Sequence, residues 1–230
     1  MAMSLYEELR KDVRFVDGLS SCINCGICTA ICPAAEFFDY DPRMIATEVQ
    51  SKDESKIEKL LKGDTIWYCG QCMSCKTRCP RGNCVGYIIL ALRKLSQEKG
   101  YFTESKRGRQ QYALGKMLIP TILKKGYCVY PDGMNPKMFP EQGPVWEWVY
   151  NHKEETYNRM GANYKKEGAG TLRKISDKSL DELNSIFDVT GATKFIDKVN
   201  KDSEKQAEKM GMRDKDGNMD RYFNHVYTKG

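Results

Sequence analysis

The sequence lacks the features of exported and membrane-spanning proteins. Its first ten residues, MAMSLYEELR, contain no apolar signal-peptide region. The longest apolar run lies around residues 85–92 and is far shorter than the roughly 20 residues that a membrane helix needs. The sequence therefore predicts a cytoplasmic protein with no membrane span of its own, which a partner could still hold at the periphery of a membrane.

Motifs for catalysis and for nucleotide binding are also missing. The chain has only two histidines, His152 and His225, and neither has a neighbour that suggests acid–base catalysis. The glycine-rich stretch EGAGT at 167–171 lacks both the pattern and the lysine of a phosphate-binding loop. The net charge of +6 is modest and the basic residues are dispersed, which argues against nucleic acid as a partner.

Cysteine, by contrast, is abundant and regularly spaced. Eight of the ten cysteines fall in two runs of the form C-x2-C-x2-C-x3-C-P. The first run consists of Cys22, Cys25, Cys28 and Cys32, followed by Pro33, and the second consists of Cys69, Cys72, Cys75 and Cys79, followed by Pro80. This is the pattern of bacterial ferredoxins that hold two [4Fe–4S] clusters. Its occurrence twice, with proline after the last cysteine each time, predicts two such clusters here.

The spacing also predicts how the thiolates are shared between the clusters. In two-cluster ferredoxins the last cysteine of each run ligates the cluster of the other run. This rule assigns one cluster to Cys22, Cys25, Cys28 and Cys79. It assigns the other cluster to Cys69, Cys72, Cys75 and Cys32. Because the crossing joins the two runs, we expect cluster assembly and folding to be coupled.

Other roles for the cysteines fit this spacing less well. A disulfide scaffold is disfavoured by the absence of an export signal and by the length of the chain. Structural zinc sites typically use pairs of ligands separated by a longer loop. Cys84 fits a small core residue, and Cys128 is interpreted as structural, although a redox thiol or a dithiol pair of the two stays open. The basic residues beside the second run are either local charge compensation for a cluster or ordinary surface charges: Lys76, Arg78 and Arg81.

Hydrophobic periodicity predicts a mainly α fold with two domains. Residues 1–100 form the first, an α-helical ferredoxin module. Its expected helices cover residues 4–16, a segment that starts at Asp41-Pro42, a segment around 57–61 that ends at Gly63, and residues 83–99. Trp67 and Tyr68 are interpreted as core aromatics, with a place beside a cluster as the alternative.

Residues 101–230 are predicted as an extended and helical region for docking to other subunits. Four prolines indicate that 101–143 is largely extended. Pro144 begins a helix that contains Trp146 and Trp148. A capping box at Ser179–Glu182 begins another, and Gly191 separates it from the next. The polar stretch from Lys201 onward predicts a flexible tail or a segment that wraps a partner.

The doubled motif, the helical connection, the CPRG sequence at 79–82 and the apolar helix after it resemble the C subunit of heterodisulfide reductase over residues 15–100. The stretch ELNSIFDVTG at 182–191 is similar to C subunits of the heterodisulfide reductase-like complex of sulfur oxidisers. The resemblance implies electron relay through two [4Fe–4S] clusters. It also implies a flavin-containing A subunit and a B subunit that carries Cys-Cys-Gly motifs and the disulfide-active centre.

This chain contains no adjacent cysteines, so we expect the catalytic part to lie on another polypeptide and this chain to be a non-catalytic subunit. It also lacks the N-terminal [2Fe–2S] domain of succinate dehydrogenase iron–sulfur subunits. Three alternatives remain open from the sequence. The chain could be an iron–sulfur redox sensor or structural protein, the iron–sulfur subunit of another flavin-dependent dehydrogenase, or an enzyme acting through Cys84 and Cys128.

Overall fold

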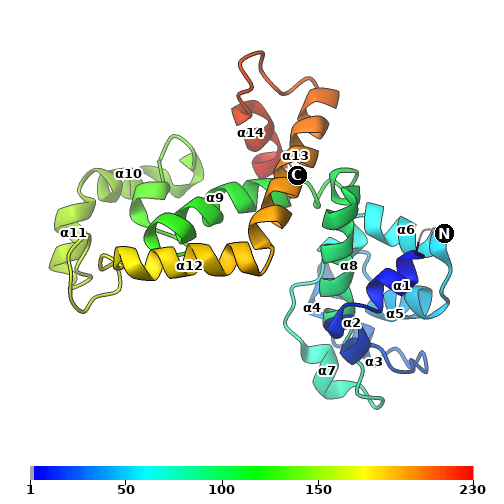
Figure 1. Cartoon of the computed structure of the whole chain (residues 1–230). Coiled ribbons are helices and arrows are strands. Elements are labelled where there is room, and N and C mark those ends of the chain that lie inside the picture. The colour runs from blue at the N-terminus through cyan, green and yellow to red at the C-terminus, as the bar shows by residue number, and fades with distance from the viewer. Residues whose placement is uncertain (1–2, 230) are drawn as a thin grey trace. The chain divides into compact units, whose positions relative to one another are not determined.

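The computed structural model describes residues 3–229, which contain helices and no β-strand. The chain divides into two compact units, drawn in Figure 1. The first comprises Met1–Gln111 with Lys198–Gly230, and the second comprises Tyr112–Asp197. The mainly α fold expected from the periodicity is confirmed. None of the described helices combines the length and the hydrophobicity that are needed to cross a bilayer.

The first unit is built around α8 (Val85–Lys99), which other helices of the unit surround in Figure 1. Its buried side chains include Ile88, Ile89 and Leu92, so much of its circumference faces the core. The helix ends at Gly100, whose φ of 78° is the left-handed conformation common after a helix C-terminus. This helix was predicted over 83–99, and the structure confirms it.

Two capped helices connect the cysteine runs, as the sequence predicted. Helix α5 (Pro42–Gln50) begins after Asp41, whose carboxylate accepts hydrogen bonds from two backbone amides of the first turn. Helix α6 (Glu54–Lys62) begins after Asp53, which caps it in the same way, and ends at Gly63. These caps supply acceptors for amides that have no partner within a helix. Both helices bury apolar side chains in the core of the first unit.

The N-terminal segment differs from the prediction of one helix over 4–16. It forms α1 (Leu5–Leu9) and α2 (Val13–Gly18), because the Asp12 carboxylate caps a new helix by accepting from the Arg14 amide. Val13 and Val16 are exposed and do not extend the core face that the spacing suggested. The predicted end at Gly18 is confirmed.

The polar C-terminal segment is helical, so the prediction of a flexible tail is wrong. Helix α13 (Ala192–Lys209) is followed by α14 (Asp220–Lys229). Tyr222, Phe223 and Val226 are buried on one face of α14. Their spacing of three and four residues is the apolar stripe of an amphipathic helix, which the surrounding charged residues obscured.

Residues 101–143, most of which belong to the second unit, are less extended than the prolines suggested. Helix α9 (Gln110–Lys125) continues through Pro120. Proline removes one helical hydrogen bond, but the pyrrolidine ring of Pro120 is exposed, and apolar residues continue on both sides of it. Two short 3₁₀ turns follow, η3 (Pro131–Gly133) and η4 (Pro140–Gln142).

The rest of the second unit contains α10 (Gly143–Asn151), α11 (Lys153–Arg159) and α12 (Asp177–Val189). Helix α12 has Ser176 as its N-cap, three residues before the predicted capping box, because the Ser176 hydroxyl accepts a hydrogen bond from the Ser179 amide. Helices α9 and α12 lie side by side in Figure 1, and Asn184 of α12 donates to the Leu123 carbonyl.

Candidate iron–sulfur centre

The two cysteine runs fold into loops with the same backbone. In the first loop Asn24 and Gly26 have φ values of 58° and 82°. In the second loop the corresponding residues, Gln71 and Met73, have φ values of 55° and 60°. This left-handed conformation is uncommon for residues other than glycine. Its repetition at matching positions indicates that both loops meet the same geometric requirement.

This backbone directs an amide toward the first sulfur of each run. The Asn24 N–H donates to Cys22 Sγ at 3.4 Å. In the second loop the Gln71 N–H donates to Cys69 Sγ, also at 3.4 Å. Hydrogen bonds to cysteine sulfur are one of the features that tune iron–sulfur clusters. The two loops therefore fit the ligand chemistry of a cluster in the same way.

A short helix follows each loop and positions the remaining cysteines. These helices are α3 (Ile27–Ala30) and α7 (Ser74–Arg78). Cys32 precedes α4 (Pro33–Phe37) as its N-cap residue, with Pro33 at the first helical position. Cys79 ends α7 in an extended conformation before Pro80. The residue before a proline favours extended backbone, which turns the last cysteine of each run away from its helix.

Two cavities in the first unit bring the eight cysteines together. The first is lined by Cys22, Cys25, Cys28, Cys75 and Cys79. The second is lined by Cys28, Cys32, Cys69, Cys72 and Cys75. Each cavity thus contains the last cysteine of the opposite run. Cys28 and Cys75 line both cavities, so the linings alone do not assign these two cysteines to one cavity or the other.

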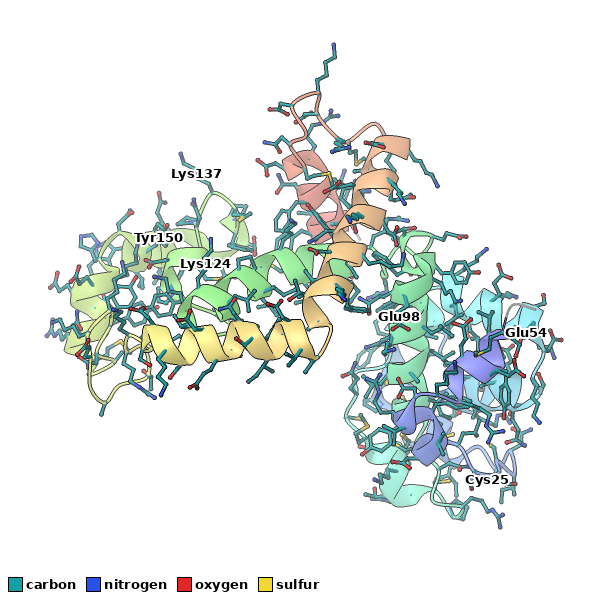
Figure 2. All side chains as sticks on the ribbon, viewed as in Figure 1. Cys25, Glu54, Glu98, Lys124, Lys137 and Tyr150 are labelled. Carbon is teal, nitrogen blue, oxygen red and sulfur yellow. The ribbon has the colours of Figure 1, made fainter. Side chains whose placement is uncertain are left out.

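The thiols differ in their surroundings, although all ten cysteines are free of disulfides. Burial raises the pKa of Cys28 and of Cys69 above the usual value. Hydrogen bonds to Ser74 lower the pKa of Cys72, which is exposed. Cys25 is exposed too and lies at the periphery of the first unit in Figure 2.

The cysteines that line the two cavities are not arranged as they would be around a single metal ion. Among residues 3–229 no three His, Cys, Asp or Glu side chains converge on one point as they would around a single ion. In a cubane each iron takes its own cysteine thiolate, so the ligands surround a group of atoms and lie further apart. The cavity linings correspond to that wider arrangement of sulfurs.

Two residues that the sequence analysis did not single out contact the second run. Arg93 of α8 donates from Nη2 to the Cys69 carbonyl and from Nε to the Ile66 carbonyl, both at 2.8 Å. The buried Tyr40 hydroxyl hydrogen-bonds to the Cys69 thiol, an interaction that lowers the pKa of Cys69 against the larger effect of burial. In the sequence, Arg93 is one of the polar residues of this largely apolar helix. Its position between Leu92 and Leu95, two apolar residues of the core helix, was the signal in the sequence that Arg93 is partly buried.

A neutral side chain holds the first run at the equivalent place. Gln50 of α5 accepts from the Cys22 amide at 2.8 Å and donates to the Cys22 carbonyl at 3.3 Å. Arg43 lines the first cavity, and its guanidinium is paired with the Asp41 carboxylate at 3.0 Å. Asp41 in turn accepts a hydrogen bond from Thr29 of α3. The network ties the start of α5 to the first cysteine run.

The remaining cysteines and aromatics lie in different environments. Cys84 is fully buried, as expected, with its Sγ 3.7 Å from Met73 Sδ, whereas Cys128 is exposed. Trp67, on η1 (Thr65–Trp67), is a buried core residue, and Tyr68 lines the second cavity. Of the three basic residues considered for charge compensation, Arg81 lines the first cavity, and all three are exposed.

This helical unit, with its two matching cysteine loops, has the features of an iron–sulfur protein of the 4Fe-4S dicluster class. Residues 18–83 match the family described as a 4Fe-4S dicluster domain. The matched segment runs from the end of α2 to the residue before Cys84, so it contains both cysteine runs and their connection.

Curated relatives identify the family within the dicluster class. The chain is 33% identical over 152 residues to the C subunit of the ferredoxin/F420H2-dependent CoB-CoM heterodisulfide reductase of Methanosarcina acetivorans, covering 64% of this chain and 86% of the relative. It is 32% identical over 145 residues to the C2 subunit of the H2/formate:CoB-CoM heterodisulfide,ferredoxin reductase of Methanococcus maripaludis, covering 61% of this chain and 72% of the relative. The chain belongs to the family of heterodisulfide reductase C subunits.

A third relative shows a higher identity over a shorter stretch. The C subunit of the ferredoxin:CoB-CoM heterodisulfide reductase of Methanosarcina acetivorans is 42% identical over 103 residues. That match covers 44% of this chain and 40% of the relative, so the chain spans less than half of that protein's length. The likeness in this case is confined to a part of each protein.

Proposed function

We propose that this chain relays electrons through two [4Fe–4S] clusters, between a flavin-containing subunit and a disulfide- or thiol-active catalytic subunit of a heterodisulfide reductase-like complex. A [4Fe–4S] cluster bound to four thiolates supplies one-electron transfer without a proton. The observation that carries the proposal is the pair of matching loops, each with an amide donated to its first cysteine sulfur at 3.4 Å. Membership in the C-subunit family supports the electron-transfer role.

The ligand sets proposed are the crossed ones. The first cluster takes Cys22, Cys25, Cys28 and Cys79. The second cluster takes Cys69, Cys72, Cys75 and Cys32. The cavity linings support this assignment, because Cys79 lines only the cavity of the first run and Cys32 only that of the second.

The chain's own residues hold the cysteines and limit solvent around them. Asn24 and Gln71 orient backbone amides toward sulfur, and Gln50 and Arg93 fix the backbone of the first cysteine of each run. Apolar side chains, among them Val85, line the cavities. The polarity of the surroundings and their exposure to solvent are among the factors that set the reduction potential of a cluster.

The partners are proposed from the family. The names of the relatives identify them as subunits of heterodisulfide reductases. We infer that this chain docks to a B-like subunit with Cys-Cys-Gly motifs and to an A-like flavoprotein. The similarity of residues 182–191 supports a complex of the kind found in sulfur oxidisers.

The test is anaerobic purification of the chain from its native cells, followed by identification of co-purifying proteins and by reduction kinetics. We expect a flavoprotein and a protein with Cys-Cys-Gly motifs to co-purify, and the flavoprotein to reduce this chain's clusters reversibly at the rate of overall turnover. Reduction far slower than turnover would contradict the relay and favour a redox sensor. A variant that loses ligands, Cys69→Ser with Cys72→Ser, serves as the control and should abolish reduction of the second cluster.

A further inference from the structure

The two cysteine loops share a backbone but not an electrostatic environment. Each loop has one side chain that clamps the backbone of its first cysteine. At Cys22 the clamp is the neutral amide of Gln50, at 2.8 and 3.3 Å. At Cys69 the clamp is the guanidinium of Arg93, at 2.8 Å. A permanent positive charge thus takes the place of a neutral group at one of two otherwise matching sites.

No carboxylate of residues 3–229 forms an ion pair with Arg93. Its side chain donates to two backbone carbonyls, and its guanidinium stacks over the Trp67 ring at 5.3 Å. The side chain is half-buried, so water screens its charge less than that of a surface arginine.

The basic groups at the first site are neutralised or solvated. The guanidinium of Arg43 is paired with Asp41 at 3.0 Å, so the two together carry no net charge. Arg81 lines the first cavity but is exposed, and water and salt screen it. Within residues 3–229, the first site therefore has no partly buried, unpaired cation corresponding to Arg93.

Two further groups strengthen the difference. The buried Tyr40 lines the second cavity together with Cys69, and its hydroxyl hydrogen-bonds to the Cys69 thiol, in addition to the Gln71 amide. The guanidinium of Arg107 lies 4.7 Å and 4.9 Å from the ring centres of Phe38 and Tyr68, both of which line the second cavity. Of the acidic residues near these groups in sequence, Glu36 and Asp39 are exposed and Asp41 is paired with Arg43. The half-buried Asp64 accepts hydrogen bonds from the Ser105 hydroxyl and the Arg107 amide.

Reduction of a thiolate-bound [4Fe–4S] group by one electron adds negative charge without adding a proton. A nearby cation and hydrogen bonds to sulfur stabilise the more negative state and raise the reduction potential. We propose that Arg93 and Tyr40 are positioning residues that give the second site, held by the second cysteine run, the higher of the two reduction potentials. This inference rests on the proposed two-cluster function, and it places the second site at the electron-accepting end of the relay.

The test is an anaerobic redox titration of the full reconstituted chain, followed by EPR. The second signal is identified by the change of its line shape in Cys69→Ser. We expect Arg93→Gln to lower the equilibrium constant for reducing the second site about tenfold, or ~59 mV for one electron, with the first site unchanged. Tyr40→Phe, which removes one oxygen, should shift the same signal in the same direction.

Lys94→Gln provides the matched control, because Lys94 is the next residue of α8 but is exposed and paired with Glu98 at 2.6 Å. It removes the same charge and should shift neither signal. Arg93→Lys separates charge from structure, since lysine retains the charge but not the two-pronged hydrogen bonding. We expect it to restore most of the potential, whereas a purely structural role would leave it as impaired as the glutamine variant.

The result that overturns the inference is a second site of equal or lower potential than the first, or an Arg93→Gln variant that shifts both signals equally or neither. Failure of the proposed function is separate from these outcomes. It would appear as a chain that holds fewer than about four irons after reconstitution, before any potential is measured.

Discussion

Gly18, the last residue of α2, lies where that helix packs against the start of α8. A Cβ atom at this position would lie 2.9 Å from the Cys84 carbonyl oxygen, 3.0 Å from Tyr87 Cβ and 3.1 Å from the Ile88 nitrogen. Two of these atoms belong to backbone and cannot rotate away. The Gly18 carbonyl also accepts the Cys84 amide at 2.8 Å, so the two segments are tied together where the clash would occur.

Gly18→Ala should therefore destabilise the first unit. Alanine favours a helix over glycine by up to ~1 kcal/mol, an effect that is smaller at the end of a helix. Forcing an extra methyl group into a packed core costs about 1–3 kcal/mol. The net expectation is a loss of ~1–2 kcal/mol, or roughly a 5- to 30-fold fall in the ratio of folded to unfolded protein.

The assay is anaerobic guanidinium unfolding of the iron-loaded chain, followed by the visible absorbance of the clusters, which reports the first unit. The variant should unfold at a lower denaturant concentration than the parent. Gly115→Ala in α9 is the matched control, because the nearest atom to its Cβ would be Ile119 Cδ1 at an ordinary 3.5 Å. Because Gly115 lies in the second unit, Gly115→Ala should leave the unfolding midpoint of the cluster absorbance unchanged. A Gly18→Ala variant as stable as the parent would refute the packing argument.

Three further outcomes follow from single contacts. Ser96→Ala removes a buried 2.6 Å hydrogen bond to the Leu61 carbonyl and should cost about 1–3 kcal/mol in denaturant unfolding; an unchanged midpoint would contradict this. The hydrogen bond from Arg14 holds the pKa of Asp12 below its usual range, so its contribution is present above the unfolded pKa of about 3.9 and is lost as pH falls through the folded pKa. Asp12→Asn should therefore be less stable than the parent near pH 6, with the difference vanishing in acid; a difference that does not change with pH would oppose the assignment. Cys128→Ser, at an exposed thiol outside both cavities, should leave iron and sulfide content unchanged, and a loss of iron would show that this thiol serves the clusters.

The parts of the fold with a regular local signal were predicted well. Asp41-Pro42 and Gly63 marked the limits of two helices because capping depends on only a few adjacent residues. The apolar face of α8 was evident because so many of its residues are buried. These features need no information about distant parts of the chain.

The errors arose where tertiary contacts outweigh local preference. Pro120 suggested extended chain, but its ring is exposed on a helix that buries Tyr112 and Ala113. In α14 a few buried aromatic residues anchor a segment that is otherwise strongly polar. Composition averages over both cases and therefore missed them.

The candidate site likewise has a part that the sequence predicted and a part that it did not. The cysteines follow from spacing, since metal-ligand patterns are local. Tyr40 and Arg93, in contrast, reach Cys69 from distant segments, and nothing in their own neighbourhood indicates a thiol partner. Gln50 lies 28 residues from Cys22, so the sequence around it did not indicate its hydrogen bond with the Cys22 amide.

The most direct test of the account compares Cys79→Ser with Cys32→Ser in the reconstituted chain by iron analysis and EPR. The crossed ligand sets predict that Cys79→Ser alters the signal of the cluster held by Cys22, Cys25 and Cys28. They predict that Cys32→Ser alters only the other signal, that of Cys69, Cys72 and Cys75. If Cys79→Ser instead disturbed only the cluster of its own run, the crossed arrangement would be wrong, and with it the joining of both runs into one electron-transfer unit.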